Sequence, residues 1–226
     1  MTMEGIALPE QVHTVTAAGQ GQGHSLVMVA VNDELVAPFD DVRVRQAIRL
    51  VTDRQAMVDL ILKGAGTASC DTPVEPSDPY RWNPEGGCPQ DIEGAKALLA
   101  AAGYADGLDL TQYTSNVLPN LVPMGESFQQ QAAATGIHVD LKVVPAGSFF
   151  TETAVKEAFI TTGWLGRPTD EILNLVFRST SPLNEAKFVN EAFDQLLDEA
   201  ARSKTWQNGL NSTRMHSSLS RPKVVI

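Results

Sequence analysis

The 226-residue sequence is short of basic side chains and has no long apolar run. Its 17 Lys and Arg against 27 Asp and Glu give a net charge of −10. This balance argues against a nucleic-acid partner, because binding the phosphate backbone requires clustered Lys and Arg. The longest strongly apolar run, Leu26 to Val31, is far shorter than the roughly 20 residues that span a bilayer, so we expect no membrane insertion.

Side chains that usually carry catalysis or hold a metal are also sparse. The four histidines are widely separated, and none stands in a metal-binding or nucleophile motif. The carboxylates fall at expected helix caps and solvent-facing positions, whereas a catalytic pair needs a shared, partly buried site. The sequence therefore predicts no catalytic residue, no metal site and no cofactor, and we do not expect an enzyme.

The overall composition is that of a folded globular protein, with 43% hydrophobic and 19% charged residues. The charge is unevenly spread, since residues 204–226 contain four basic residues and no Asp or Glu. This stretch also has no helical or alternating periodicity. We interpret residues 204–226 as a disordered or foreign tail, and a basic interaction tail is the alternative.

The amino-terminal residues do not form a signal peptide pattern, since Glu4, Pro9, Glu10 and His13 stand where an apolar core would be needed. Residues 19–24 (GQGQGH) resemble a glycine-rich phosphate loop only superficially. Such a loop needs a preceding strand and a following helix that aim backbone N–H groups at a phosphate. We interpret this segment as a flexible linker.

The two cysteines, Cys70 and Cys88, lie in one long loop rich in Pro and Gly. No metal-binding spacing fits them. A disulfide closing this loop would stabilise the fold by about 3 kcal/mol in the chain-entropy model and would imply an oxidising compartment. Two free thiols in a reducing compartment are the alternative.

Apolar periodicity predicts an α/β fold. Strands are expected at residues 25–32, 108–115, 137–144 and 158–162. One helix is expected to begin at a cap at Asp40 or Asp41, and another to run from a capping box at residues 52–55 to Gly64, with Met57, Leu60 and Ile61 pointing inward. Three more helices are expected over residues 91–103, 125–135 and 148–156, and a last one begins at a cap at Asn190. The strand, helix and strand over residues 108–144 describe a right-handed βαβ unit.

One segment, residues 161–168 (TTGWLGRP), has the composition of a recognition site after a strand end, where α/β sheets gather ligands. Gly163 lets backbone approach a ligand, and Trp164 offers a flat apolar surface. Arg167 offers a forked donor for a carboxylate or phosphate.

Two further candidates complete this predicted ligand site: Thr162, within the same segment, and Asn32, at the end of the first expected strand. The structural alternative is a Trp packed in the core beside an Arg that pairs with Asp170 or Glu171.

Several segments, taken together and in order, resemble the extracytoplasmic solute-binding proteins of the peptide, nickel and opine class, family 5. The similar segments are residues 38–48 (PFDDVRVRQAI), 52–54 (TDR), 94–104 (GAKALLAAAGY), 134–139 (ATGIHV) and 190–200 (NEAFDQLLDEA). The resemblance extends from about residue 26 to residue 203. It implies a periplasmic-binding-protein type II-like large lobe with a mixed sheet and βαβ units, incomplete by comparison with the two-lobed family.

The same resemblance implies three parts in the chain. Residues 1–32 would be a remnant of the first lobe with the strand that crosses the hinge. Residues 33–203 would be the second, carboxy-terminal lobe, truncated, and residues 204–226 the tail.

The function implied by the resemblance is that of the substrate-binding component of an ABC importer. Such a protein captures a peptide-like or other small solute and delivers it to ABC permease subunits. The intact parent protein of this chain would be periplasmic or extracytoplasmic. Peptide-binding relatives often have an Asp three residues after the Trp, where it holds the ammonium group of the ligand. Arg167 stands there, which suggests an anionic ligand group. The alternative function is a stand-alone interaction or assembly module that has lost its ligand cleft.

Overall fold

The computed structural model describes residues 14–19, 24–30, 36–74, 78, 80–81 and 84–202. Its strands are β1 (Thr14–Gly19), β2 (His24–Ala30), β3 (Thr67–Ser69), β4 (Leu108–Ser115), β5 (Ile137–Val144) and β6 (Phe159–Leu165). Its α-helices are α1 (Val42–Val51), α2 (Arg54–Leu62), α3 (Ile92–Ala101), α4 (Leu121–Ala133), α5 (Thr169–Val176) and α6 (Glu191–Arg202).

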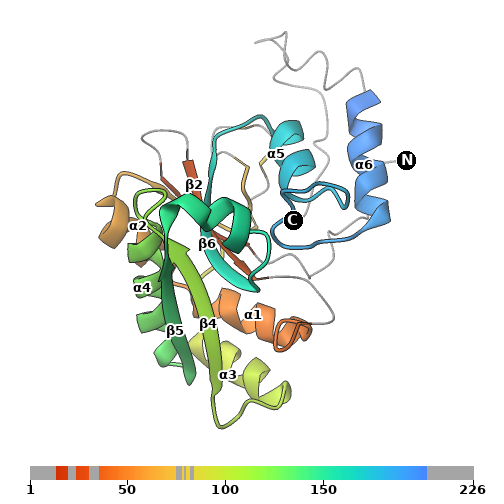
Figure 1. Cartoon of the computed structure of the whole chain (residues 1–226). Helices are drawn as coiled ribbons and strands as arrows, with labels where there is room; N and C mark the ends of the chain where they lie inside the picture. Colours follow the sequence, from red (N-terminus) through yellow and green to blue (C-terminus); the bar gives the residue numbers. More distant parts are fainter. Residues whose placement is uncertain are drawn as a thin grey trace.

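The six strands form one mixed sheet in the order β3-β1-β2-β6-β4-β5. Strands β1, β2 and β3 pair antiparallel, and β2 also pairs antiparallel with β6. Strands β6, β4 and β5 run parallel, and α4 connects β4 to β5 (Figure 1). The predicted α/β class, mixed sheet and βαβ unit are therefore confirmed.

The two faces of the sheet are covered by different helices, each with its own apolar core. Helices α1, α3 and α4 contribute to the first core, and α5 and α6 contribute to the second. In Figure 1, α5 and α6 lie at the upper right, away from α3 and α4. Strand β6 supplies both cores, because alternate side chains of a strand point to opposite faces: Phe159 packs in the first core and Ile160 in the second.

Helix α1 confirms the sequence pattern that predicted it. Asp41 is the N-cap, and its side chain accepts a hydrogen bond from the Arg43 N–H. The residues spaced at i, i+3, i+4 and i+7 are all buried: Val44, Ala47, Ile48 and Val51. This spacing places them on one face of the helix.

Helix α2 differs from its prediction in two details. Its N-cap is Asp53, whose side chain accepts from the Ala56 N–H, while Thr52 ends α1 and donates its hydroxyl to the Ile48 carbonyl. Leu60 was expected to point inward but is 69% exposed, because Met57 and Val58 set the inward face and Leu60 falls on its flank.

Other predicted boundaries also change. The helix expected over residues 148–156 is a short 3-10 turn followed by the π-helix Phe149–Thr153. The linker expected at residues 19–24 is wrong at both ends, because Gly19 ends β1 and pairs with His24, which begins β2. Strands β1 and β3 and helix α5 were not expected.

Several predictions concern residues outside the described part of the chain: Asn32, residues 20–23 and the tail at 204–226. Strands β1 and β2 belong to the same sheet as β4, β5 and β6. The assignment of residues 1–32 to a first-lobe remnant and of 33–203 to a second lobe stays a prediction.

Candidate functional site

The first part of the candidate ligand segment, residues 161–165, lies within strand β6, which continues to Leu165. Gly163 and Trp164 were expected beyond the end of the strand, but they pair with Leu26 and Ser25 of β2. The antiparallel partner prolongs the strand, because it satisfies backbone groups that a turn would have exposed. The strand is therefore longer than predicted, and its pairing fixes the backbone of Gly163 and Trp164.

The period of two along β6 separates the predicted residues by face. The Thr161 hydroxyl donates to Thr114 on one face of the sheet. Thr162 and Trp164 point to the other face, toward the second core. There both side chains meet Glu185, from the loop between α5 and α6.

Glu185 receives one hydrogen bond on each carboxyl oxygen. The Thr162 hydroxyl donates to Oε1 at 3.2 Å, and the Trp164 indole Nε1 donates to Oε2 at 3.2 Å. The residue is 6% exposed. Burial raises the pKa of the Glu185 carboxyl to about 8, although the hydrogen bonds from Trp164 and Thr162 lower it. The site thus holds a carboxyl group that is poised to exchange a proton near neutral pH.

Reasoning from the sequence did not find Glu185. It lies 21 residues after Trp164 in a loop without periodicity, and no motif surrounds it. The sequence signal for a buried loop was weak: Ala186 and Phe188, one and three residues after Glu185, are apolar, and both are buried. Apolar residues in a polar loop indicate that the loop enters a core.

Arg167 lies beyond the end of β6 and forms an ion pair with Glu171 in the first turns of α5. This is one of the two pairings that the sequence left open as a structural alternative. Its side chain is 31% exposed and that of Glu171 is 50% exposed, so the pair lies at the surface. Trp164 is partly buried against the second core. Arg167 and Trp164 therefore meet different acidic partners.

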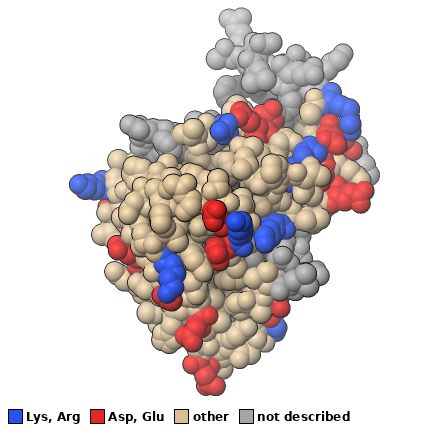
Figure 2. All heavy atoms as spheres, in the orientation of Figure 1, with Lys and Arg blue, Asp and Glu red and all other residues tan. Residues whose placement is uncertain are grey.

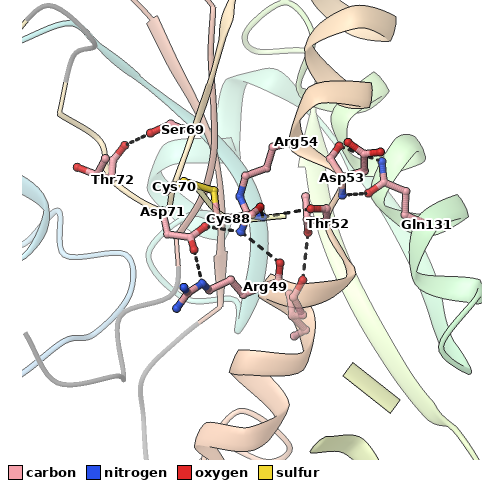
Figure 3. A network of polar contacts seen from close by, with 11 residues as sticks. Arg49, Thr52, Asp53, Arg54, Ser69, Cys70, Asp71, Thr72, Cys88 and Gln131 are labelled. Atoms are coloured by element: carbon pink, nitrogen blue, oxygen red, sulfur yellow. Dashed lines mark hydrogen bonds and ion pairs between the residues drawn. A yellow bond between two sulfur atoms is a disulfide. The ribbon is translucent and has the colours of Figure 1, made fainter. Parts of the chain in front are cut away.

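A second polar cluster lies around the cysteine loop (Figure 3). Cys70 and Cys88 are joined by a disulfide, and their Cα atoms are 5.6 Å apart. The neighbouring Asp71 carboxylate meets Arg54 at 2.7 Å and Arg49 at 2.6 Å. Arg54 also donates to the carbonyl of Cys88 at 3.1 Å. The cluster therefore ties both ends of the disulfide loop to helices α1 and α2.

Burial and charge oppose each other at Asp71. The residue is 4% exposed and Arg54 is 3% exposed. Burial is the larger influence and raises the pKa of the Asp71 carboxyl above its usual value, although the guanidinium groups of Arg54 and Arg49 lower it. Two cations thus compensate this carboxylate, which suits a structural clamp more than a ligand site.

The visible surface shows no large area of one charge. Figure 2 shows Lys and Arg side chains next to Asp and Glu side chains on the face drawn. Within the described residues, no group of three or more His, Cys, Asp or Glu side chains could hold a metal ion. Among the same residues, none of the helices has the length and apolar character needed to cross a membrane.

Comparison with known families identifies the class of protein. Residues 7–182 match the model of the bacterial extracellular solute-binding proteins, family 5, middle region. The chain belongs to this family, whose members are solute-binding proteins. The resemblance noted in the sequence is therefore confirmed.

Individual relatives bind different solutes. The chain is 32% identical over 191 residues to heme-binding protein A of Haemophilus influenzae, covering 79% of this chain and 34% of that protein. It is 29% identical over 177 residues to a dipeptide-binding protein of Pseudomonas aeruginosa, covering 73% of this chain and 32% of that protein. The chain thus spans about a third of the length of these curated relatives.

A solved structure supports the fold. HbpA2 from Haemophilus parasuis superposes with a TM-score of 0.71 at 26% identity, covering 88% of this chain and 40% of that structure. The fold is accordingly that of the type II periplasmic-binding-protein class, as the sequence predicted.

Proposed function

We propose that the chain is a lobe of the substrate-binding component of an ABC importer. It would contribute one wall of a ligand cleft, capture a peptide-like or other small solute and present it to ABC permease subunits. The observation that supports this proposal is the family match over residues 7–182, joined to relatives that bind heme and dipeptides. The expected location is periplasmic or extracytoplasmic, where a disulfide such as Cys70–Cys88 persists.

The proposed ligand wall consists of Gly163, Trp164 and Arg167, with Asn32 as a further contact. Thr162, which the sequence grouped with them, is fully buried, and its hydroxyl binds Glu185. Trp164 would offer its indole face to apolar parts of the solute. Gly163 has no side chain between the strand and a ligand. These assignments rest on the resemblance and on the position of the segment at the carboxyl end of β6.

Arg167 is the proposed contact for an anionic group of the solute. Its present partner, Glu171, lies at the surface, and exposed ion pairs contribute only about 0.2 to 1 kcal/mol. A ligand carboxylate that binds the guanidinium through two hydrogen bonds would therefore displace Glu171 at little cost. Freed Glu171 would remain hydrated.

A binding screen tests the proposal. We would measure the thermal shift of the purified chain with dipeptides, tripeptides, glutathione and hemin, and then titrate each hit by calorimetry. Arg167→Ala should weaken binding of an anionic hit by about 2 to 5 kcal/mol, and Arg167→Lys should also weaken it because an ammonium lacks the fork.

Glu171→Gln is the matched control, because it removes the surface pair and leaves Arg167 intact. It should bind as tightly as the wild type or slightly more tightly. Absence of any hit would contradict the binding function. An Arg167→Ala variant that binds normally but melts at a much lower temperature would assign Arg167 a purely structural role.

A further inference from the structure

The contact between Glu185 and strand β6 joins two segments that are far apart in the sequence. Thr162 and Trp164 are neighbours on one face of β6, and each binds a different oxygen of the same carboxyl group. The two hydrogen bonds together fix the carboxyl plane relative to the strand. They also fix the rotation of the indole, since its Nε1–H is the only polar group of that side chain.

The loop that carries Glu185 is held firmly in place. The Asn184 side chain donates to the carbonyl of Phe188 at 2.6 Å and accepts from the Phe188 N–H at 3.0 Å. Ala186 and Phe188 are 5% and 1% exposed within the second core. Phe188 also packs edge-on against Phe193 of α6. Because residues on both sides of Glu185 are anchored, its side chain cannot leave the core without displacing the loop.

The charged side chains of neighbouring segments form no ion pair with Glu185 among the described residues. Among the described ion pairs, none involves Glu185, and the cations on the adjacent elements pair elsewhere: Arg167 with Glu171, and Arg178 with Asp198 of α6. In the same loop, Lys187 lies two residues after Glu185. In helix α6, the Asp194 side chain accepts a hydrogen bond from the Ser179 N–H.

Strand β4 adds one further titratable group on this face. Tyr113 packs against the second core, and burial followed by the neighbouring Glu157 raises the pKa of its phenol. Tyr113 is therefore neutral wherever Glu185 titrates. No described cation compensates the Glu185 carboxyl, which has only the dipoles of Thr162 and Trp164 as partners.

We propose that Glu185 is the positioning residue of the ligand wall: its carboxyl group holds the Trp164 indole and the Thr162 hydroxyl in one fixed arrangement on strand β6. This proposal rests on the proposed function for its purpose, but the positioning itself is a property of the chain. A stiff indole loses less entropy when a solute packs against it than a freely rotating one. Glu185 thus acts on the ligand through Trp164 without needing to contact it.

The test uses the fluorescence of a single tryptophan in the full chain. The sequence has three Trp residues, so Trp82→Phe together with Trp206→Phe leaves Trp164 as the only emitter. In this background we expect the Trp164 emission to titrate with a midpoint near pH 8. Glu185→Gln should abolish the titration yet keep the indole anchored, because the amide oxygen still accepts its hydrogen bond.

Glu185→Leu removes both hydrogen-bond acceptors and puts an apolar side chain of similar size in their place. Its fluorescence anisotropy should fall and its quenching by acrylamide should rise, whereas Glu185→Gln should match the parent in both. Thr162→Val is the matched control, since it removes one hydrogen bond to Glu185 and leaves that from Trp164. An unchanged anisotropy in a folded Glu185→Leu protein, or a titration that survives in Glu185→Gln, would overturn the proposal.

Ligand binding provides a separate readout. For any solute that binds the wild type, Glu185→Leu should weaken binding about tenfold, and Glu185→Gln should restore most of it. If the fluorescence results hold while hemin, glutathione and the di- and tripeptides all fail to bind, the positioning stands and the proposed function fails. Equal affinity in wild type and Glu185→Leu would show that the hydrogen bonds of Glu185 to Trp164 and Thr162 play no part in ligand binding.

Discussion

Asp71 and Glu185 are both buried carboxyl groups, but they lie in different regions and have different partners. Asp71 stands between two guanidinium groups beside the disulfide, at the junction of α1, α2 and the cysteine loop. Glu185 lies under β6 and accepts hydrogen bonds only from neutral donors. The Asp71 carboxyl group is held by ion pairs that tie the cysteine loop to two helices, whereas Glu185 has only neutral donors as partners and a pKa raised to about 8. The comparison separates a structural clamp from a site able to respond.

The largest expected effect comes from breaking the clamp. Asp71→Asn leaves the buried Arg54 without its anionic partner, and removal of one member of a buried pair costs about 3 to 5 kcal/mol. Denaturant unfolding monitored by circular dichroism measures the change. Arg49→Met is the matched control: Arg49 is 38% exposed, so its removal should cost clearly less. Equal losses in the two variants would show that burial does not set the cost.

The disulfide should give the next largest effect. Cys70→Ala with Cys88→Ala opens a loop whose ends are 18 residues apart, and the chain-entropy model assigns such a closure about 3 kcal/mol. Mass spectrometry of unreduced protein first establishes that the bond is present in exported material. The unfolding midpoint of the wild type in reductant should then match that of the double variant. Two free thiols in exported protein would contradict the prediction.

The pH dependence of stability sharpens the contrast at Glu185. Its pKa is raised from the usual 4.5 to about 8 in the folded state. Between these pH values the folded protein keeps the proton that the unfolded chain has lost, so stability falls as the pH rises. Below about pH 4.5 Glu185 causes no loss in the free energy of unfolding, and above about pH 8 the loss has reached its full size.

At about 1.4 kcal/mol per pKa unit the full shift would correspond to about 5 kcal/mol. Water that reaches the charged carboxylate reduces this value, so the loss should be at least about 2 kcal/mol. Urea unfolding from pH 5 to pH 9 tests this, and Glu185→Gln should remove this component of the slope. A slope that is the same in Glu185→Gln and wild type would assign the pH dependence to another group.

Helices α1 and α6 could be predicted from local patterns, whereas the Asp71 ion pairs beside α1 could not. The Asp41 cap and the apolar spacing of α1 lie within one short segment, as do the Asn190 cap and the buried Phe193 and Leu197 of α6. Both helices form as predicted because the signals are contained in a few consecutive residues.

The surroundings of Trp164 could be predicted only in part. Trp164 was identified as a candidate from the composition of residues 161–168. Its backbone pairing, however, is with β2, more than a hundred residues earlier in the sequence. The Glu185 contact depends on how the loop before α6 folds back on the sheet. Neither relation leaves a periodic signal, because sequence patterns report on neighbours within an element and not on which elements meet.

An exposed carboxylate completes the series with the smallest expected effect. Asp198 of α6 pairs with Arg178 at 2.8 Å, and its side chain is 52% exposed. Solvent screens this pair, so Asp198→Asn should change the free energy of unfolding by less than about 1 kcal/mol. Arg178 keeps its hydrogen bond to Asn174, and therefore the loop carrying Glu185 should stay in place. The Trp164 emission should still titrate with a midpoint near pH 8 in this variant. A shifted midpoint would mean that the Arg178–Asp198 pair influences Glu185 from the surface, and the distinction between an isolated buried carboxyl and its charged surroundings would have to be redrawn.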